Sequence, residues 1–235
     1  MKKSIFKHTF VNISILILLT VLVCPGVLSA EEKDENDEIE WNFDKDMQGS
    51  VPAGWKVAET GGMKKTNTMA TWEVVADSSA PSKSQVVVIT KNKNFGNTFN
   101  LLLAEKTSFK DVEVEVKVKA LSGKEDQGGG PIWRAKDTDN YYICRWNPLE
   151  DNLRVYFVKN GKRKQIGSAE LKTDSTTWHE IKIRHNGTKI TVKFDSKELL
   201  VIEDDTFQAA GMVGLWTKAD AATAFDSFEV EAEDN

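Results

Sequence analysis

The sequence is poor in residues that form covalent or metal cross-links. It has two cysteines, Cys24 and Cys144, and three histidines in 235 residues. If Cys24 is lost with an N-terminal signal segment, Cys144 has no partner for an intrachain disulfide. One cysteine and two histidines outside that segment cannot build a usual His/Cys zinc cluster. Stability must therefore come from a hydrophobic core, which about two hundred residues can supply in a single domain.

The sequence also lacks an apolar run long enough to span a bilayer. Its longest run, 13–23, is about eleven to thirteen residues, well short of the roughly twenty that a membrane-spanning helix needs. The run follows three lysines and ends in small residues at Ser29-Ala30, which is the pattern of a signal peptide. A retained anchor is the rival interpretation, and Val23 argues against lipid modification of Cys24. We therefore expect residues 1–30 to be a signal peptide cleaved near Ala30, and the remainder to be exported, periplasmic or extracellular.

Basic residues are outnumbered by acidic ones in the remainder. The formal net charge is −5, and removal of three lysines with residues 1–30 takes it to about −8. Without a basic patch to neutralise phosphates, nucleic acid and anionic membrane surfaces are poor partners. Residues 31–40 are almost all acidic or polar, so we expect an acidic disordered tail there. A single globular domain is expected over 41–235.

No stretch of ten or more residues shows a helical period, whereas alternation of apolar and polar residues is frequent. In 111–119 every second residue is valine and the others are charged, which predicts a strand with one buried face. Further strands are expected at 85–90, 99–104, 131–135, 141–146, 198–202, 211–217 and 225–231. Many short strands without a βαβ rhythm predict an all-β fold, an antiparallel two-sheet jelly-roll sandwich.

Two Asn-Gly pairs predict hairpin turns with a definite register. One lies within 185–188 and the other within 159–162, each between alternating segments. The pairs expected from these turns are Ile183 with Ile190, Ile181 with Val192, Phe157 with Lys164 and Val155 with Ile166. Apolar residues then fall on one side of the first hairpin and charged residues on the other, as a half-buried sheet requires.

Three segments, 128–142, 147–152 and 214–228, carry a resemblance to a known fold family. They resemble concanavalin A-like (laminin-G-like) jelly rolls and, more narrowly, exported bacterial domains of the 3-keto-disaccharide hydrolase (family 16 glycoside hydrolase-like) group. The resemblance implies a curved sandwich whose concave face holds a sugar. The Glu-x-Asp-x-x-Glu signature of family 16 glucanases, which supplies carboxyls about 5 Å apart on one strand, is found on none of the expected strands, so no catalytic residue is assigned.

Aromatic and planar polar side chains are the expected sugar site, because rings pack on the CH groups of sugars while amides and guanidinium groups fix hydroxyls. If the turn at 136–140 sets Ala135 opposite Tyr141, Trp133 and Arg145 share the face of Tyr141, and Ile132 faces the core. The alternative is that these aromatics are themselves core residues. The candidate substrate-binding residues are Trp133, Arg134, Tyr141, Arg145, Asn147, Trp216 and Lys218.

Asp44 and Asp226 are candidate ligands of a structural calcium ion, because the first and last strands of such sandwiches often neighbour each other. Calcium requires more oxygen ligands than these two. No other cofactor is expected. The sequence does not predict the oligomeric state.

Three functions remain open at this point. The first is a secreted carbohydrate-recognising sandwich that binds an oligosaccharide or polysaccharide without catalysis. The second is a glycoside hydrolase or 3-keto-disaccharide hydrolase acting on an extracellular sugar, and the third is an extracellular protein-interaction module. Saturable glycan binding, release of a sugar product and capture of envelope proteins would distinguish them.

Overall fold

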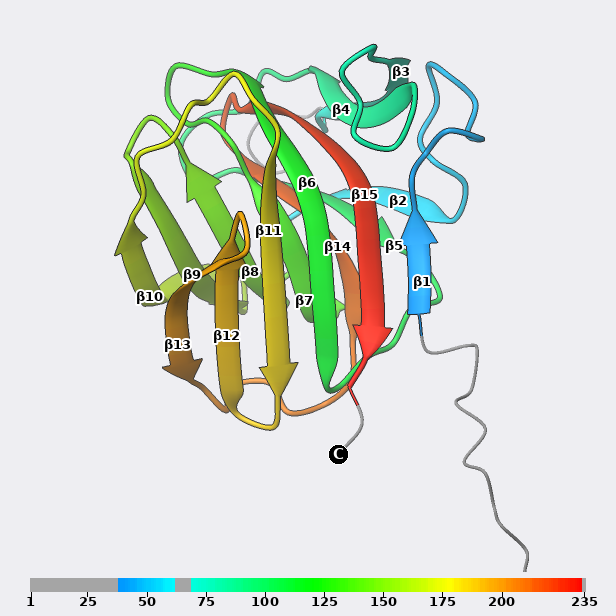
Figure 1. Ribbon diagram of the computed structural model, residues 1–235. Helices are drawn as coiled ribbons and strands as arrows, with labels where there is room; N and C mark the ends of the chain where they lie inside the picture. The colour runs from blue at the N-terminus through cyan, green and yellow to red at the C-terminus, as the bar shows by residue number, and fades with distance from the viewer. Residues whose placement is uncertain (1–37, 62–68, 234–235) are drawn as a thin grey trace, which may run out of the picture. The chain divides into compact units, whose positions relative to one another are not determined.

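The computed structural model describes residues 38–61 and 69–233, in which fifteen β-strands and no helix occur (Figure 1). Nothing in these ranges is a helical segment suited to crossing a bilayer. The expected signal peptide and most of the expected acidic tail, residues 31–37, lie outside the described residues. The strands form two antiparallel sheets, so the predicted all-β sandwich is confirmed.

The first sheet, here called sheet A, has the strand order β13-β12-β11-β6-β15-β4-β3, and β1 also pairs with β15. Its strands are β1 (Glu38–Trp41), β3 (Thr71–Ala76), β4 (Gln85–Lys91), β6 (Val112–Ser122), β11 (His179–Asn186), β12 (Lys189–Phe194), β13 (Lys197–Glu203) and β15 (Ala222–Ala232). The front layer of Figure 1 shows β13, β12, β11, β6 and β15 side by side.

The second sheet, sheet B, has the order β10-β9-β8-β7-β14-β5-β2. Its strands are β2 (Trp55–Glu59), β5 (Phe99–Ala104), β7 (Gly130–Asp137), β8 (Asn140–Asn147), β9 (Asn152–Lys159), β10 (Lys162–Glu170) and β14 (Met212–Lys218). Some neighbouring strands come from distant parts of the sequence, as in the pairing of β6 with β15 and of β7 with β14.

The core fills the space between the inner faces of the two sheets. The alternating valines of β6 are fully buried there, while Glu113 and Glu115 between them face outward and keep partial exposure. Sheet B contributes Tyr142, Cys144 and Trp146 from β8, all fully buried. Burial raises the pKa of the Cys144 thiol, so this residue acts as a small apolar side chain.

The β9–β10 hairpin has the expected register next to its turn. In the β9–β10 hairpin Phe157 pairs with Lys164, and Asn160 and Gly161 both have positive φ, as a type I′ turn requires. A bulge after Gln165 then sets Val155 opposite Gly167 rather than Ile166. This bulge is a local correction that leaves the turn unchanged.

The β11–β12 hairpin is displaced by two residues from the expected register. Ile183 pairs with Val192 and Ile181 with Phe194, because the strands close at Asn186 and Lys189 instead of at 185 and 188. Gly187, with φ 57°, is the turn residue that adopts the left-handed region. A shift of two keeps every side chain on its expected face, so the isoleucines still enter the core.

The N-terminal side of the domain differs from the expectation. Strand β1 begins at Glu38, so residues 38–40 of the expected acidic tail belong to sheet A. The reason is that Ile39 and Trp41 alternate with the acids, and the Trp41 ring lies 5.3 Å from Trp55 and 5.6 Å from Phe228. Strands β2 and β3 were not predicted.

Candidate functional site

The outer face of sheet B, which points away from sheet A, carries most of the expected sugar-binding residues. Tyr141 and Trp216 lie there in a second apolar cluster with Leu101, Ile132 and Ile143. Arg145, Asn147 and Lys218 continue the same face toward the ends of β8 and β14. The structure therefore brings five of the seven candidates to one surface, while Trp133 and Arg134 lie elsewhere.

Trp133 faces the core, which corrects the expectation. The β7–β8 pair sets Ile132 opposite Ile143 and Trp133 opposite Tyr142, one residue away from the expected register. A bulge follows Trp133, and Arg134 within it has φ 46°. Since a one-residue slip exchanges the faces of a strand, Trp133 stacks on Tyr142 in the core with a ring separation of 5.5 Å.

Arg134 is buried, and its guanidinium is bonded to the chain itself. Its Nη2 donates to Asp111 Oδ1 over 3.1 Å and to the Gly187 carbonyl over 3.1 Å, and its Nη1 donates to the Phe207 carbonyl over 2.8 Å. Its Nε donates to the Lys110 carbonyl. The side chain is inaccessible to solvent. These hydrogen bonds connect the β5–β6 loop and the β11–β12 turn to the segment before β14.

Tyr141 and Trp216 cannot stack on a sugar as expected, because both are fully buried. The Trp216 Nε1 donates to the Tyr141 hydroxyl over 3.1 Å, and that hydroxyl also lies 2.8 Å from Thr60 Oγ1. Thr60 follows β2 and reaches across the face to the β7–β8 turn, where it bonds to the Thr138 carbonyl. Burial raises the pKa of Tyr141, so the phenol stays neutral.

Asp126 joins three of the expected residues into one cluster. Its carboxylate accepts hydrogen bonds from Arg145 Nη1 over 3.2 Å, Asn147 Nδ2 over 3.1 Å and Lys218 Nζ over 2.8 Å. The side chain of Asp126 is 1 % exposed. Burial raises the pKa of this carboxyl, and Arg145 and Lys218 offset part of that rise. We call these four residues the Asp126 cluster.

The loop that carries Asp126 is held in place by backbone contacts. The Asp220 carboxylate accepts hydrogen bonds from the backbone N–H groups of Lys124, Glu125 and Asp126, at distances of 2.7 to 3.1 Å. The glycines at 128–130, which lead from this loop into β7, have no room for a side chain. A Cβ at Gly130, for example, would lie 2.1 Å from the Cys144 carbonyl oxygen. No period or motif marks Asp126 in the sequence.

Partly exposed side chains form the rim of the Asp126 cluster. Glu150 Oε2 accepts from Arg145 Nη2 over 2.9 Å and from Arg154 Nη1 over 2.8 Å. The side chains of Glu150 and Arg154 are 41 % and 32 % exposed. Asn152 Oδ1 adds a third acceptor for Arg145. The buried Asp126 and Arg145 therefore lie beneath the partly exposed Glu150 and Arg154, which a solute can contact.

The expected calcium ligands are both engaged by the chain itself. Asp44 Oδ1 accepts from the backbone N–H groups of Ser84 and Gln85, over 3.0 and 3.2 Å. Asp226 accepts from the N–H groups of Ser82 and Ser227, over 2.8 and 2.7 Å. Across residues 38–61 and 69–233 no group of three or more His, Cys, Asp or Glu is arranged to hold a metal ion. These two carboxylates organise the 82–85 loop.

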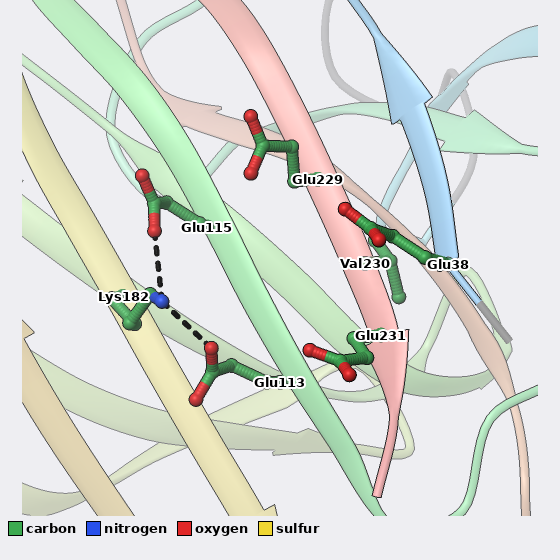
Figure 2. A pocket seen from close by; sticks show the side chains of 7 residues that line it. All are labelled: Glu38, Glu113, Glu115, Lys182, Glu229, Val230 and Glu231. Atoms are coloured by element: carbon green, nitrogen blue, oxygen red, sulfur yellow. Dashed lines mark hydrogen bonds and ion pairs between the residues drawn. The ribbon is translucent and has the colours of Figure 1, made fainter. Parts of the chain in front are cut away.

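The outer face of sheet A bears a groove lined by carboxylates (Figure 2). Lys182 Nζ bonds Glu113 over 2.7 Å and Glu115 over 3.0 Å, while Glu229 and Glu231 stand beside them on β15. Register explains the crowding, because Glu229 lies directly opposite Glu115. Burial raises the pKa of Glu229, as do the neighbouring carboxylates, Glu115 first.

The substitution Glu229→Gln is expected to stabilise the protein at pH 7 by about 0.5 kcal/mol, because like charges opposite each other in a sheet are unfavourable. The pKa of the Glu229 carboxyl is raised in the folded protein, so its ionisation destabilises the fold. This loss of stability grows as pH rises through the titration of Glu229. The gain should therefore vanish near pH 4. Urea unfolding at both pH values measures it, with exposed Glu105→Gln as the control. A variant less stable at pH 7 would contradict the repulsion.

Comparison with known proteins gives a fold but no family. No protein-family profile and no curated protein sequence matches the chain. The solved structure of the carbohydrate binding module CBM66 from Bacillus subtilis covers 80 % of this chain and 99 % of its own, with a TM-score of 0.60 and 19 % identity.

Two further solved structures agree with it. Domain 4 of AbnA, an extracellular arabinanase from Geobacillus stearothermophilus in complex with arabinotriose, has a TM-score of 0.54 and 13 % identity over 82 % of this chain and 90 % of its own. The VIP36 exoplasmic/lumenal domain in its Ca2+/Man3GlcNAc-bound form has a TM-score of 0.52 and 13 % identity over 85 % and 89 %. The described part of the chain thus has the galectin-like, concanavalin A-like jelly-roll fold.

Proposed function

We propose that this protein is an exported carbohydrate-recognising domain that binds a glycan on the outer face of sheet B, which would be the concave face. The observation that carries the proposal is the Asp126 cluster, in which three polar residues expected to bind sugar converge on one buried carboxylate. The similar solved structures of a carbohydrate binding module and of an arabinanase domain in complex with arabinotriose support it. The signal-peptide pattern of residues 1–30 supports export.

Recognition on this face would rest on hydrogen bonds and not on ring stacking, because Tyr141 and Trp216 are enclosed. Glu150 offers carboxylate oxygens, and Arg154 and Lys218 offer N–H donors, so the rim can meet both the donor and the acceptor of a sugar hydroxyl. The bonds to Arg145 hold Glu150 in place, and a preorganised group loses little entropy when a ligand binds.

The test is a glycan array with the purified protein, followed by calorimetry on the oligosaccharides that bind. We expect saturable binding without sugar release. The substitutions Glu150→Gln and Arg154→Gln should each weaken it at least tenfold, since hydrogen bonds to charged groups contribute about 1.5–3 kcal/mol. Lys193→Gln, on the exposed outer face of sheet A, is the matched control and should change nothing. Sugar release, or equal affinity in all variants, would overturn the proposal.

A further inference from the structure

Arg163 occupies an unusual position on the outer face of sheet B. It lies on β10 opposite Val158 of β9. Its guanidinium carbon is 4.3 Å from the ring centroid of Tyr156, 5.1 Å from that of Phe99 and 5.8 Å from that of Trp216. Rings from three strands therefore surround one cation, and aromatic rings attract a guanidinium without bonding its N–H groups.

This cation has no anionic partner, unlike the other arginines. The chain has five arginines, and four of them bond a carboxylate: Arg134, Arg145, Arg154 and Arg184. Within the described ranges, Arg163 makes no ion pair, and its Nη1 is enclosed without any hydrogen-bond partner. An enclosed donor without a partner is unfavourable, and more so when it is charged. Nε and Nη2 of Arg163 are not enclosed in this way and make no hydrogen bond within the described residues, so a ligand can supply an acceptor to these two nitrogens.

The electrostatic surroundings point the same way. Four cationic side chains, Arg145, Arg154, Arg163 and Lys218, lie on this face, and two carboxylates, Asp126 and Glu150, bond three of them. Both carboxylates are already occupied by bonds to the other three cations. Burial, followed by repulsion from Arg145, lowers the pKa of Arg163. An added negative charge is therefore favoured beside Arg163.

We propose that Arg163 binds the carboxylate of an acidic sugar, so that the glycan recognised by this domain contains uronic acid. The inference rests on the proposed function and names its ligand class. A guanidinium offers two parallel N–H groups that match the two oxygens of a carboxylate, a geometry that a lysine ammonium cannot reproduce. Glu150, Arg154 and Lys218 lie on the same face and would bind the hydroxyls of the same or the next sugar.

The direct experiment compares two probes that differ only at the carboxyl group, namely oligogalacturonate and its fully methyl-esterified form, by calorimetry with the purified protein. The acid is expected to bind at least tenfold more tightly than the ester. Arg163→Met should remove this difference, and Arg163→Lys should restore only a small part of it. Arg184→Gln, which removes an exposed arginine from sheet A, should retain the full difference.

Each other outcome is decisive. Equal binding of acid and ester overturns the role of Arg163 while the proposed function stands. A difference that persists in Arg163→Met also overturns it, as does tight binding of a sulfated glycan with none of the uronate. Failure of every glycan on the array removes the proposed function and this inference together. If Arg163→Met fails to fold, the acid–ester comparison on the unaltered protein and on Arg163→Lys still gives the answer.

Discussion

Replacing Arg134 with methionine is expected to lower the free energy of unfolding by about 3–5 kcal/mol, the usual cost of breaking a buried ion pair. The substitution leaves the Asp111 carboxylate, whose side chain is 3 % exposed, without its cation. It also leaves the carbonyls of Lys110, Phe207 and Gly187 without their donor. Urea unfolding followed by tryptophan fluorescence measures the loss.

Arg154→Met is the matched control for this prediction. Arg154 also bonds a carboxylate, but both side chains of that pair are partly exposed, so the loss should be below about 1 kcal/mol. A change in Arg134→Met as small as in the control would mean that Arg134 is not the structural residue described above. The expectation that it contacts sugar would then be open again.

Acidification from pH 7 to pH 4.5 is expected to reduce stability by about 2 to 3 kcal/mol through His185 alone. Burial, and secondly the charge of Arg134, lowers the pKa of His185 from 6.5 to about 3. His185 therefore becomes protonated below about pH 6.5 in the unfolded chain, but only below about pH 3 in the folded protein. The imidazole must stay neutral because its Nδ1 accepts the hydrogen bond of Trp133 Nε1 over 2.9 Å.

His185→Asn isolates this effect from the other titrating groups. The asparagine carbonyl can accept from Trp133 but does not titrate, so the difference between the two proteins should narrow as pH falls from 7 to 4.5. Guanidinium unfolding at four pH values in this window gives the two curves. Parallel curves would show that His185 is protonated in the folded protein and that the burial argument is wrong.

The sandwich fold was predictable because its long strands alternate strictly. The valines of β6 and the isoleucines of β11 enter the core as expected, and an even shift in register leaves their faces unchanged. Strands β2 and β3 were missed because the segments before 85 hold short strands without a long alternating pattern. Alternation indicates strands only where several residues repeat it.

The site was predictable in part. Arg145, Asn147 and Lys218 share a face and converge, but the carboxylate that unites them, Asp126, lies in a loop without periodicity. Trp133 was placed on the wrong face because a bulge at Arg134 reverses the parity of β7. A sequence pattern indicates which face a side chain takes, but not whether a segment such as Thr60 or a cation such as Arg163 covers that face.

The central claim is that a glycan binds the outer face of sheet B around the Asp126 cluster. The most direct measurement is to titrate isotope-labelled protein with the tightest-binding oligosaccharide of the array and record backbone and side-chain NMR shifts. We predict that the largest shifts fall on β8, β9, β10 and β14, with the side chains of Asn147, Arg154 and Arg163 among them. Shifts confined to the carboxylate groove of sheet A, around Glu113 and Lys182, would contradict the claim.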